Sequence, residues 1–221
     1  MGIVPLLGRD VNLQTDLFNE LNDIDVKSEH AIPELVKPWL GYFPDFVSHI
    51  DAIELYQQLE QQLDWQQPEI VVFSKRHPIP RLQCWQSDEG VQYQYSGKAL
   101  NENAWHPLLE RVRDHIHAQH GVYFNSVLLN FYRNGEDKMG GHSDDEPELG
   151  PNPIVASLSV GASRTMHFKD KKTNQTVAVE LSNGALLMMK AGMQRAFKHQ
   201  VPSRKKVREG RISLTFRYIH R

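Results

Sequence analysis

The segment Arg211-Ile-Ser-Leu-Thr-Phe-Arg217 alternates polar and apolar side chains without interruption. Successive side chains of a strand point to opposite faces, so the three apolar residues share one face and the four polar residues share the other. Arg211 and Arg217 therefore project from the same side. Two buried guanidinium groups would be costly without an anion, and a dicarboxylate would suit them because arginine forks onto carboxylates. An edge strand with a solvated polar face is the alternative.

Short segments of similar character fill the rest of the second half of the chain. Strands are predicted at residues 122–132, 154–160, 165–168, 176–181, 185–189 and 211–219, with shorter ones at 70–73 and 91–95. Turns separate them, as at Asn134-Gly135 and Asn183-Gly184. In the first of these segments Asn130 and Tyr132 alternate with apolar residues, which places two hydrogen-bonding groups on one strand face.

Two helices are predicted before most of these strands. The first spans residues 48–63, where Ser48 and Asp51 fit an N-terminal cap. Its apolar face is expected to hold Ile53, Tyr56, Leu59 and Leu63. The second spans residues 104–119, and its apolar stripe is Trp105, Leu108, Leu109, Val112 and Ile116. Helices followed by many closely spaced strands predict an α+β chain whose second half is a β-sandwich or jelly roll.

Length and composition are those of an ordinary globular protein. The chain has 221 residues, 40% hydrophobic and 24% charged, which suffices for a real core. No apolar run approaches the roughly 20 residues of a membrane helix, so no membrane association is expected. The lone Cys84 excludes a disulfide framework. Residues 1–46 are expected to form an acidic lead-in with one short helix near 16–21, and residues 47–221 a single domain.

The net charge of −2 conceals a strong polarity along the chain. Residues 1–60 carry a net charge of −8, residues 61–189 carry −3, and residues 190–221 carry +9. A basic region on an acidic body gives a dipole whose positive end can face a polyanion such as nucleic acid. A solvated C-terminal surface is the plainer explanation of the same charges.

Two His-x-Asp pairs are candidates for metal ligands. His49 and Asp51 fall at a predicted helix start, where residues i and i+2 point apart, so they are better explained by capping. His142 and Asp144 follow a glycine-rich loop in a strand-rich region, where residues i and i+2 share a face and can meet one ion. His199 can supply a third ligand. Two histidines and a carboxylate suit a non-haem Fe(II) oxygenase site, and a zinc site is the competing assignment.

These residues together resemble a known family. The run Asn130-Phe-Tyr132, then His142-Ser-Asp144-Asp-Glu146, His199, Arg211 and Arg217 is similar to the AlkB family of Fe(II)/2-oxoglutarate-dependent dioxygenases. The likeness covers residues 68–219 and is strongest to the animal-type branch that repairs alkylated DNA. The segments that support it include Val72-Phe-Ser-Lys75, Ile79-Pro-Arg81 and Val201-Pro-Ser-Arg-Lys-Lys206.

The resemblance implies a double-stranded β-helix with supporting N-terminal helices and a nucleotide-recognition region at about 68–100. It implies that His142, Asp144 and His199 bind Fe(II). Arg217 and Tyr132 would hold the distal carboxylate of 2-oxoglutarate, and Arg211 and Asn130 would contact its keto-acid end. The implied reaction uses O₂ and 2-oxoglutarate to remove N-methyl groups from bases such as 1-methyladenine and 3-methylcytosine, releasing formaldehyde, succinate and CO₂.

The resemblance also implies substrate contacts. Phe73 would enter the gap left by a flipped base, with a buried core position as the alternative. Arg81 would lie near the flipped base or the gap. Tyr93, Tyr95 and Ser96 would wall the base pocket. Glu146 would face a cationic lesion, while Asp145 would point outward. Arg204, Lys205 and Lys206 would grip the opposite strand.

Two other interpretations of the function stay open. One keeps the chemistry and changes the substrate to RNA or protein, and the other is a non-catalytic nucleic-acid-binding jelly roll. Alkylated DNA, single- or double-stranded, is the expected partner, with RNA as the alternative. We expect a monomer, cytoplasmic in a bacterium or nuclear in a eukaryote.

Overall fold

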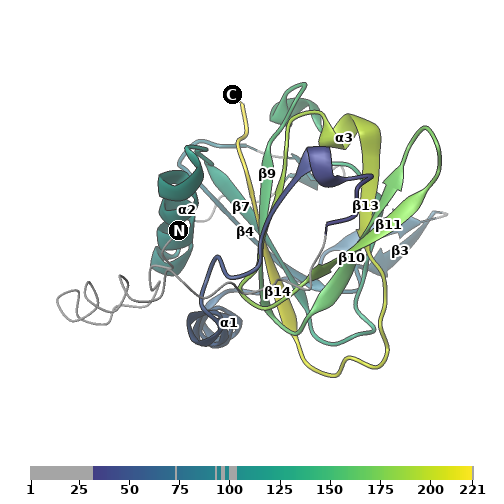
Figure 1. Ribbon diagram of the computed structural model, residues 1–221. Helices are drawn as coiled ribbons and strands as arrows, with labels where there is room; N and C mark the ends of the chain where they lie inside the picture. The colour runs from purple at the N-terminus through teal and green to yellow at the C-terminus, as the bar shows by residue number, and fades with distance from the viewer. Residues whose placement is uncertain (1–31, 73, 93, 96–97, 100–103, 221) are drawn as a thin grey trace.

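Two antiparallel sheets form the centre of the molecule, with two helices outside the larger one (Figure 1). The computed structural model describes residues 32–220 except 73, 93, 96–97 and 100–103. The larger sheet has the order β1 (Leu40–Phe43), β12 (Leu186–Met189), β9 (Val155–Gly161), β14 (Arg211–Arg217), β7 (Ser126–Tyr132) and β4 (Leu82–Ser87). The smaller has the order β11 (Thr176–Leu181), β10 (Arg164–Asp170), β13 (Phe197–Val201) and β8 (Met139–His142). The predicted jelly roll is confirmed.

Shorter elements complete the described part of the chain. Two small hairpins pair β2 (Glu69–Val72) with β3 (Lys75–Pro78) and β5 (Gln94–Tyr95) with β6 (Lys98–Ala99). The helices are α1 (His49–Gln62), α2 (Pro107–His120), α3 (Met193–Ala196) and the 3₁₀ turns η2 (Lys37–Trp39) and η3 (Pro147–Leu149). No helix among the described residues is long and apolar enough to span a membrane.

Helix α1 begins where the sequence predicts, and its buried face matches the predicted face in part. The Ser48 hydroxyl accepts a hydrogen bond from the backbone N–H of Asp51 at 3.2 Å, which caps the helix. Its buried residues are Ala52, Leu55 and Leu59. Ile53, predicted for the core, is 41% exposed. The prediction is therefore wrong for Ile53, whereas Leu59 and Leu63 are buried and Tyr56 is partly buried against the same core.

Helix α2 follows the prediction closely. Leu108, Leu109, Val112 and Ile116 are buried against the larger sheet. Gly121 ends the helix in the left-handed conformation, with φ of 67°. In Figure 1 both α1 and α2 lie on the side of the larger sheet that faces away from the smaller sheet.

Strand β14 is buried on both faces. Its apolar residues Ile212, Leu214 and Phe216 pack in the core between the sheet and the helices. Its polar residues point into the space between the two sheets, and Arg211 and Arg217 are only 1% and 3% exposed. The solvated edge strand is therefore excluded, since β14 lies between β9 and β7 in the middle of the sheet.

Residues before position 47 pack with the larger sheet and its core. Leu40–Phe43 forms the edge strand β1, which pairs with β12 along its whole length. Phe46 and Val47 are buried in the helix-side core. The last part of the expected lead-in thus packs with the domain, while the short helix expected near residues 16–21 lies outside the described residues.

Gly135 holds the β13–β14 loop through backbone hydrogen bonds, and this contact can be tested by substitution. Gly135 exchanges backbone hydrogen bonds with this loop, accepting from Arg204 N at 2.6 Å and donating to Val207 O at 2.9 Å. A Cβ at Gly135 would collide with the Arg204 carbonyl oxygen, whereas a Cβ at Gly140 would meet nothing within 4 Å. We predict that Gly135→Ala lowers the free energy of unfolding in urea by about 1–3 kcal/mol. Gly140→Ala should change it by no more than about 0.5 kcal/mol, and equal effects would contradict the prediction.

Candidate metal and dicarboxylate site

Strand pairing brings the two candidate histidines together. His142 ends β8 and lies directly opposite His199 on β13 in the ladder. Asp144 follows two residues later, and one ligand atom from each of the three side chains lies within 4.8 Å of the others. The imidazole centroids of His142 and His199 are 4.2 Å apart. The predicted third ligand, 57 residues along the chain, is thus placed by sheet register.

Neighbouring groups orient two of the ligands. The Nδ1 atom of His142 is 3.0 Å from the carbonyl oxygen of Gly140, which leaves Nε2 for a metal. The backbone N–H of Asp144 donates to Oε1 of Gln194 at 3.0 Å, and Gln194 lies on α3. Figure 1 shows α3 near the top of the molecule, beside β13. Nothing in the sequence singles out Gln194, because one glutamine in a short helix carries no recognisable signal.

The carboxylate of Asp144 is fully buried and ionised. Burial raises its pKa, but the positive charge of Arg217, together with the electrostatic effects of His199 and His142, outweighs burial and lowers the pKa to about 2. Arg217 Nη2 donates to Oδ2 at 3.1 Å. The other oxygen, Oδ1, has no hydrogen-bond partner among the described residues and lies 3.6 Å from His142 Nε2.

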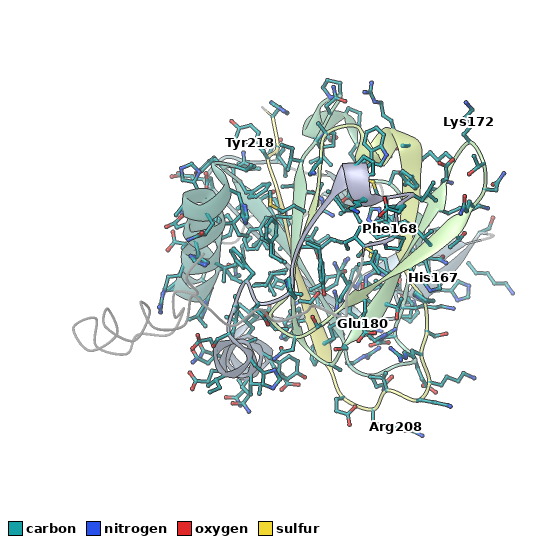
Figure 2. The ribbon with its side chains drawn as sticks, viewed as in Figure 1. His167, Phe168, Lys172, Glu180, Arg208 and Tyr218 are labelled. Atoms are coloured by element: carbon teal, nitrogen blue, oxygen red, sulfur yellow. The ribbon has the colours of Figure 1, made fainter. Side chains whose placement is uncertain are left out.

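His199 is neutral at physiological pH. Burial and then the neighbouring His142 lower its pKa to about 3. A neutral imidazole is the form that binds a metal. Phe168 on β10 packs beside it with ring centroids 6.2 Å apart, and Figure 2 labels Phe168 together with the preceding residue, His167.

These observations fit a divalent cation. A buried carboxylate oxygen without a hydrogen bond needs a positive partner, and two imidazole nitrogens lie within reach of the same point. Two histidines and one carboxylate form the facial triad that leaves positions open for small ligands. The triad alone also suits zinc, so the choice of iron depends on the neighbouring pocket.

A narrow cavity between the sheets adjoins the triad. Its walls include Asn130, Tyr132 and Arg217 together with both histidines. Ser157, Ser213 and Thr215 add hydroxyl groups, and Met139, Met166 and Met189 add apolar surface. The cofactor-binding residues predicted from strand alternation therefore share one interior space, apart from Arg211, which lies beyond Tyr132.

The two arginines of β14 lie at opposite ends of the strand. Arg217 contacts Asp144 and so belongs to the metal end. Arg211 is six residues away, about 20 Å along an extended strand. The geometry therefore favours the reverse of the expected roles: Arg217 lies at the keto-acid end, and Arg211 lies where a distal carboxylate would be held.

Arg211 has spare hydrogen-bonding capacity in a buried position. Its Nη2 donates to Ser159 Oγ at 2.8 Å, while Nε and Nη1 find no partner among the described residues. Burial lowers its pKa to about 10. Its guanidinium lies 5.3 Å from the ring centroid of Tyr132, and that of Arg164 lies 5.5 Å from the same ring. An anionic carboxylate would satisfy the free N–H groups and stabilise the charge.

Arg164 is a buried residue that the sequence does not reveal. It is 1% exposed and donates to three backbone carbonyls, those of Asn134, Asp137 and Pro202. It thereby holds the β7–β8 and β13–β14 loops against the end of β10. Because its acceptors are all main-chain atoms, no side-chain motif could have identified it.

The predicted substrate residues fall into three groups. Glu146 is partly buried just after the triad, and Asp145 is exposed as expected. Arg204, Lys205 and Lys206 are exposed on the loop before β14, and Arg208 of the same loop projects at the bottom of Figure 2. Tyr95 lies in β5, while Phe73, Tyr93 and Ser96 lie outside the described residues.

Arg81 does not line the cavity. Its side chain is 7% exposed and donates from Nε to Asn130 Oδ1 at 2.7 Å. The expectation that it reaches the flipped base has no support in this geometry, since the guanidinium lies behind a residue of the cavity wall.

Comparisons with known proteins agree with this site. Residues 40–217 match the family model described as the 2OG-Fe(II) oxygenase superfamily. The chain is 39% identical over 180 residues to DNA oxidative demethylase ALKBH2 of Homo sapiens, covering 76% of this chain and 69% of that protein. It is 36% identical over 188 residues to human alpha-ketoglutarate-dependent dioxygenase alkB homolog 3, covering 80% of this chain and 65% of that protein.

A solved structure supports the fold. The structure of OsALKBH1 superposes with a TM-score of 0.55 at 19% identity, covering 80% of this chain and 97% of the other.

The pKa of His199 predicts acid sensitivity of the metal-free protein. The folded-state value of about 3 lies below the ordinary 6.5, so the unfolded chain takes up a proton first as pH falls. Stability present above pH 6.5 should therefore be lost progressively as pH falls toward 3, by up to about 1.4 kcal/mol per pH unit. Urea unfolding with chelator between about pH 7 and 4.5 measures this slope, and His199→Gln should make it shallower. Parallel slopes for the two proteins would rule out this contribution.

Proposed function

This chain belongs to the AlkB family within the 2OG-Fe(II) oxygenase superfamily, and we infer that it demethylates N-alkylated bases in DNA by oxidation. It is an Fe(II)/2-oxoglutarate-dependent dioxygenase. The family is shown by a match over residues 40–217 and by relatives at 36–39% identity. The human relative ALKBH2 is named a DNA oxidative demethylase, which supports DNA as the substrate.

One observation carries the assignment within this structure. A buried His-Asp-His cluster opens onto a cavity walled by Tyr132, and behind Tyr132 the buried guanidinium of Arg211 keeps two N–H groups unsatisfied among the described residues. A zinc hydrolase needs no buried arginine in addition to its metal. A dicarboxylic cosubstrate that binds the metal through one carboxylate does need a positively charged group, at a fixed distance from the metal, for its other carboxylate. Iron with 2-oxoglutarate fits both ends.

The side chains have separate tasks at the two ends. Arg211 is suited to hold the distal carboxylate, with Tyr132 packed against the guanidinium. The positive charge of Arg217 lies beside the Asp144 carboxylate and favours its ionised form, next to the two imidazoles. Bound iron and 2-oxoglutarate supply the oxidation of an N-methyl group by O₂, with release of formaldehyde, succinate and CO₂. The methionine side chains of the cavity wall restrict water there.

The nucleic-acid contacts are proposed from charge and exposure. Arg204, Lys205 and Lys206 lie on a loop whose backbone is held by hydrogen bonds to Gly135. The backbone from which these three side chains extend therefore has a fixed position. Such a loop is suited to phosphates. Glu146, partly buried next to the triad, suits a lesion whose methyl group leaves a positive charge on the base, as in 1-methyladenine and 3-methylcytosine.

We predict that His142→Ala abolishes demethylation, because it removes a metal ligand. The assay incubates protein with Fe(II), ascorbate, 2-oxoglutarate and an oligonucleotide containing 1-methyladenine, and detects unmodified adenine by mass spectrometry. His49→Ala, which alters the other His-x-Asp pair, should retain activity within about twofold. Absence of product with the unaltered protein would overturn the proposed function. Parallel arms with single-stranded DNA, duplex DNA and RNA rank the substrates.

We predict that Lys205→Ala with Lys206→Ala weakens DNA binding in a salt-dependent manner. For each phosphate contact that the double variant removes, the slope of log affinity against log salt should fall by about 1. Fluorescence anisotropy of a labelled duplex at several salt concentrations gives this slope. Lys37→Ala removes an exposed lysine outside the loop and should leave it unchanged. An unaltered slope in the double variant would show that the loop does not contact DNA.

A further inference from the structure

We propose that Arg81 is a positioning residue that fixes the amide of Asn130 in the orientation needed to donate a hydrogen bond to the cosubstrate. The proposal rests on the proposed function only in taking 2-oxoglutarate as the cavity's ligand. It assigns Arg81 to the cosubstrate site rather than to DNA.

The contact is buried on both sides. Arg81 is 7% exposed and Asn130 is 3% exposed. Arg81 Nε donates to Asn130 Oδ1 at 2.7 Å, a short distance typical of a charge-assisted hydrogen bond. Gln83 Nε2 donates to the same oxygen at 3.0 Å, from the position directly opposite Asn130 in the β4–β7 ladder.

These two donors decide which way the amide faces. An asparagine amide has an accepting oxygen at one end and a donating nitrogen at the other. With Oδ1 held by Arg81 and Gln83, Nδ2 is left facing away from β4, and it makes no hydrogen bond with the described residues. The reversed amide would set N–H groups against a guanidinium, so the arginine charge excludes it.

The orientation matters because Asn130 forms part of the cavity wall beside Tyr132 and Arg217. A nitrogen facing this cavity offers hydrogen bonds to a carboxylate or keto oxygen. The reversed amide would present an oxygen there and repel the same ligand. Arg81 therefore acts on the cosubstrate through Asn130, although it is absent from the cavity wall.

Backbone contacts hold Arg81 in place. Its Nη1 lies 3.5 Å from the carbonyl oxygen of Lys138, and the backbone N–H of Lys138 donates to Pro80 O at 3.0 Å. Lys138 directly precedes β8, which carries His142. The guanidinium thus bridges β7 and the segment leading to a metal ligand, which a shorter or uncharged side chain could not do.

A double-mutant cycle tests the proposal. Isothermal titration measures 2-oxoglutarate binding to the Mn(II)-loaded full chain for the unaltered protein, Arg81→Met, Asn130→Ala and the double variant. Each single change should weaken 2-oxoglutarate binding about tenfold, the loss expected from one charge-assisted hydrogen bond. In the Asn130→Ala background, Arg81→Met should add less than about twofold, because its effect passes through the missing amide.

Three companion measurements separate positioning from other roles. Mn(II) affinity and duplex DNA affinity of Arg81→Met should each stay within about twofold of the unaltered protein. Gln83→Leu, which removes the second donor without changing charge, should weaken 2-oxoglutarate binding in the same direction. Arg76→Met removes an arginine that is 81% exposed on the nearby hairpin and should leave 2-oxoglutarate binding unchanged.

The opposite pattern would overturn the proposal. Weaker DNA binding with unchanged 2-oxoglutarate binding would make Arg81 a DNA contact, and a full additional loss in the double variant would show that it acts independently of Asn130. If Arg81→Met does not fold, the same cycle with Arg81→Lys, which keeps the charge and loses the fork, decides between these outcomes. Failure of the unaltered protein to bind 2-oxoglutarate would instead count against the proposed function.

Discussion

Positive charge buried between two sheets is the constraint on which the site depends. Arg164, Arg211 and Arg217 are all at most 3% exposed, and the guanidinium groups of Arg164 and Arg211 lie against the same ring, that of Tyr132. Each needs acceptors, because a buried guanidinium without them would be severely destabilising. Arg164 obtains three backbone carbonyls and Arg217 obtains the Asp144 carboxylate. Arg211 donates to the hydroxyl groups of Ser159 and Ser213, while its Nε and Nη1 have no acceptor among the described residues, and this shortage of acceptors marks where an acidic ligand would bind.

The same constraint explains why strand alternation is so informative. A strand in the middle of a sheet, covered on both faces, is normally continuously apolar. Strand β14 instead keeps strict alternation while buried on both faces. Its polar face therefore has to meet partners inside the protein, and the shared face of Arg211 and Arg217 could be predicted from the sequence alone. The order of their roles could not, because alternation gives the face of a strand but not which end approaches the metal.

Other features lie beyond prediction from the sequence for physical reasons. The strands β8 and β13 have the sequences Met-Gly-Gly-His and Phe-Lys-His-Gln-Val, which lack a clear apolar period, so only the ligands they carry are recognisable. Strand β4 is not predicted because glutamines at positions 83 and 86 are buried by hydrogen bonding rather than by apolarity. The substrate contact of Arg81 is predicted from the family resemblance alone, and the sequence does not reveal its partner Asn130, which is 49 residues away.

The register between β8 and β13 has a further consequence for how the protein is made. His142 and Asp144 are local to each other, but His199 lies 57 residues after His142, beyond four intervening strands. An ion held by all three side chains therefore links two parts of the chain that are far apart in sequence. Because the complete site exists only when β8 and β13 are paired in the folded protein, the free energy of metal binding adds to the free energy of unfolding. Iron supply would then set the amount of folded protein in a cell as well as the amount of active protein.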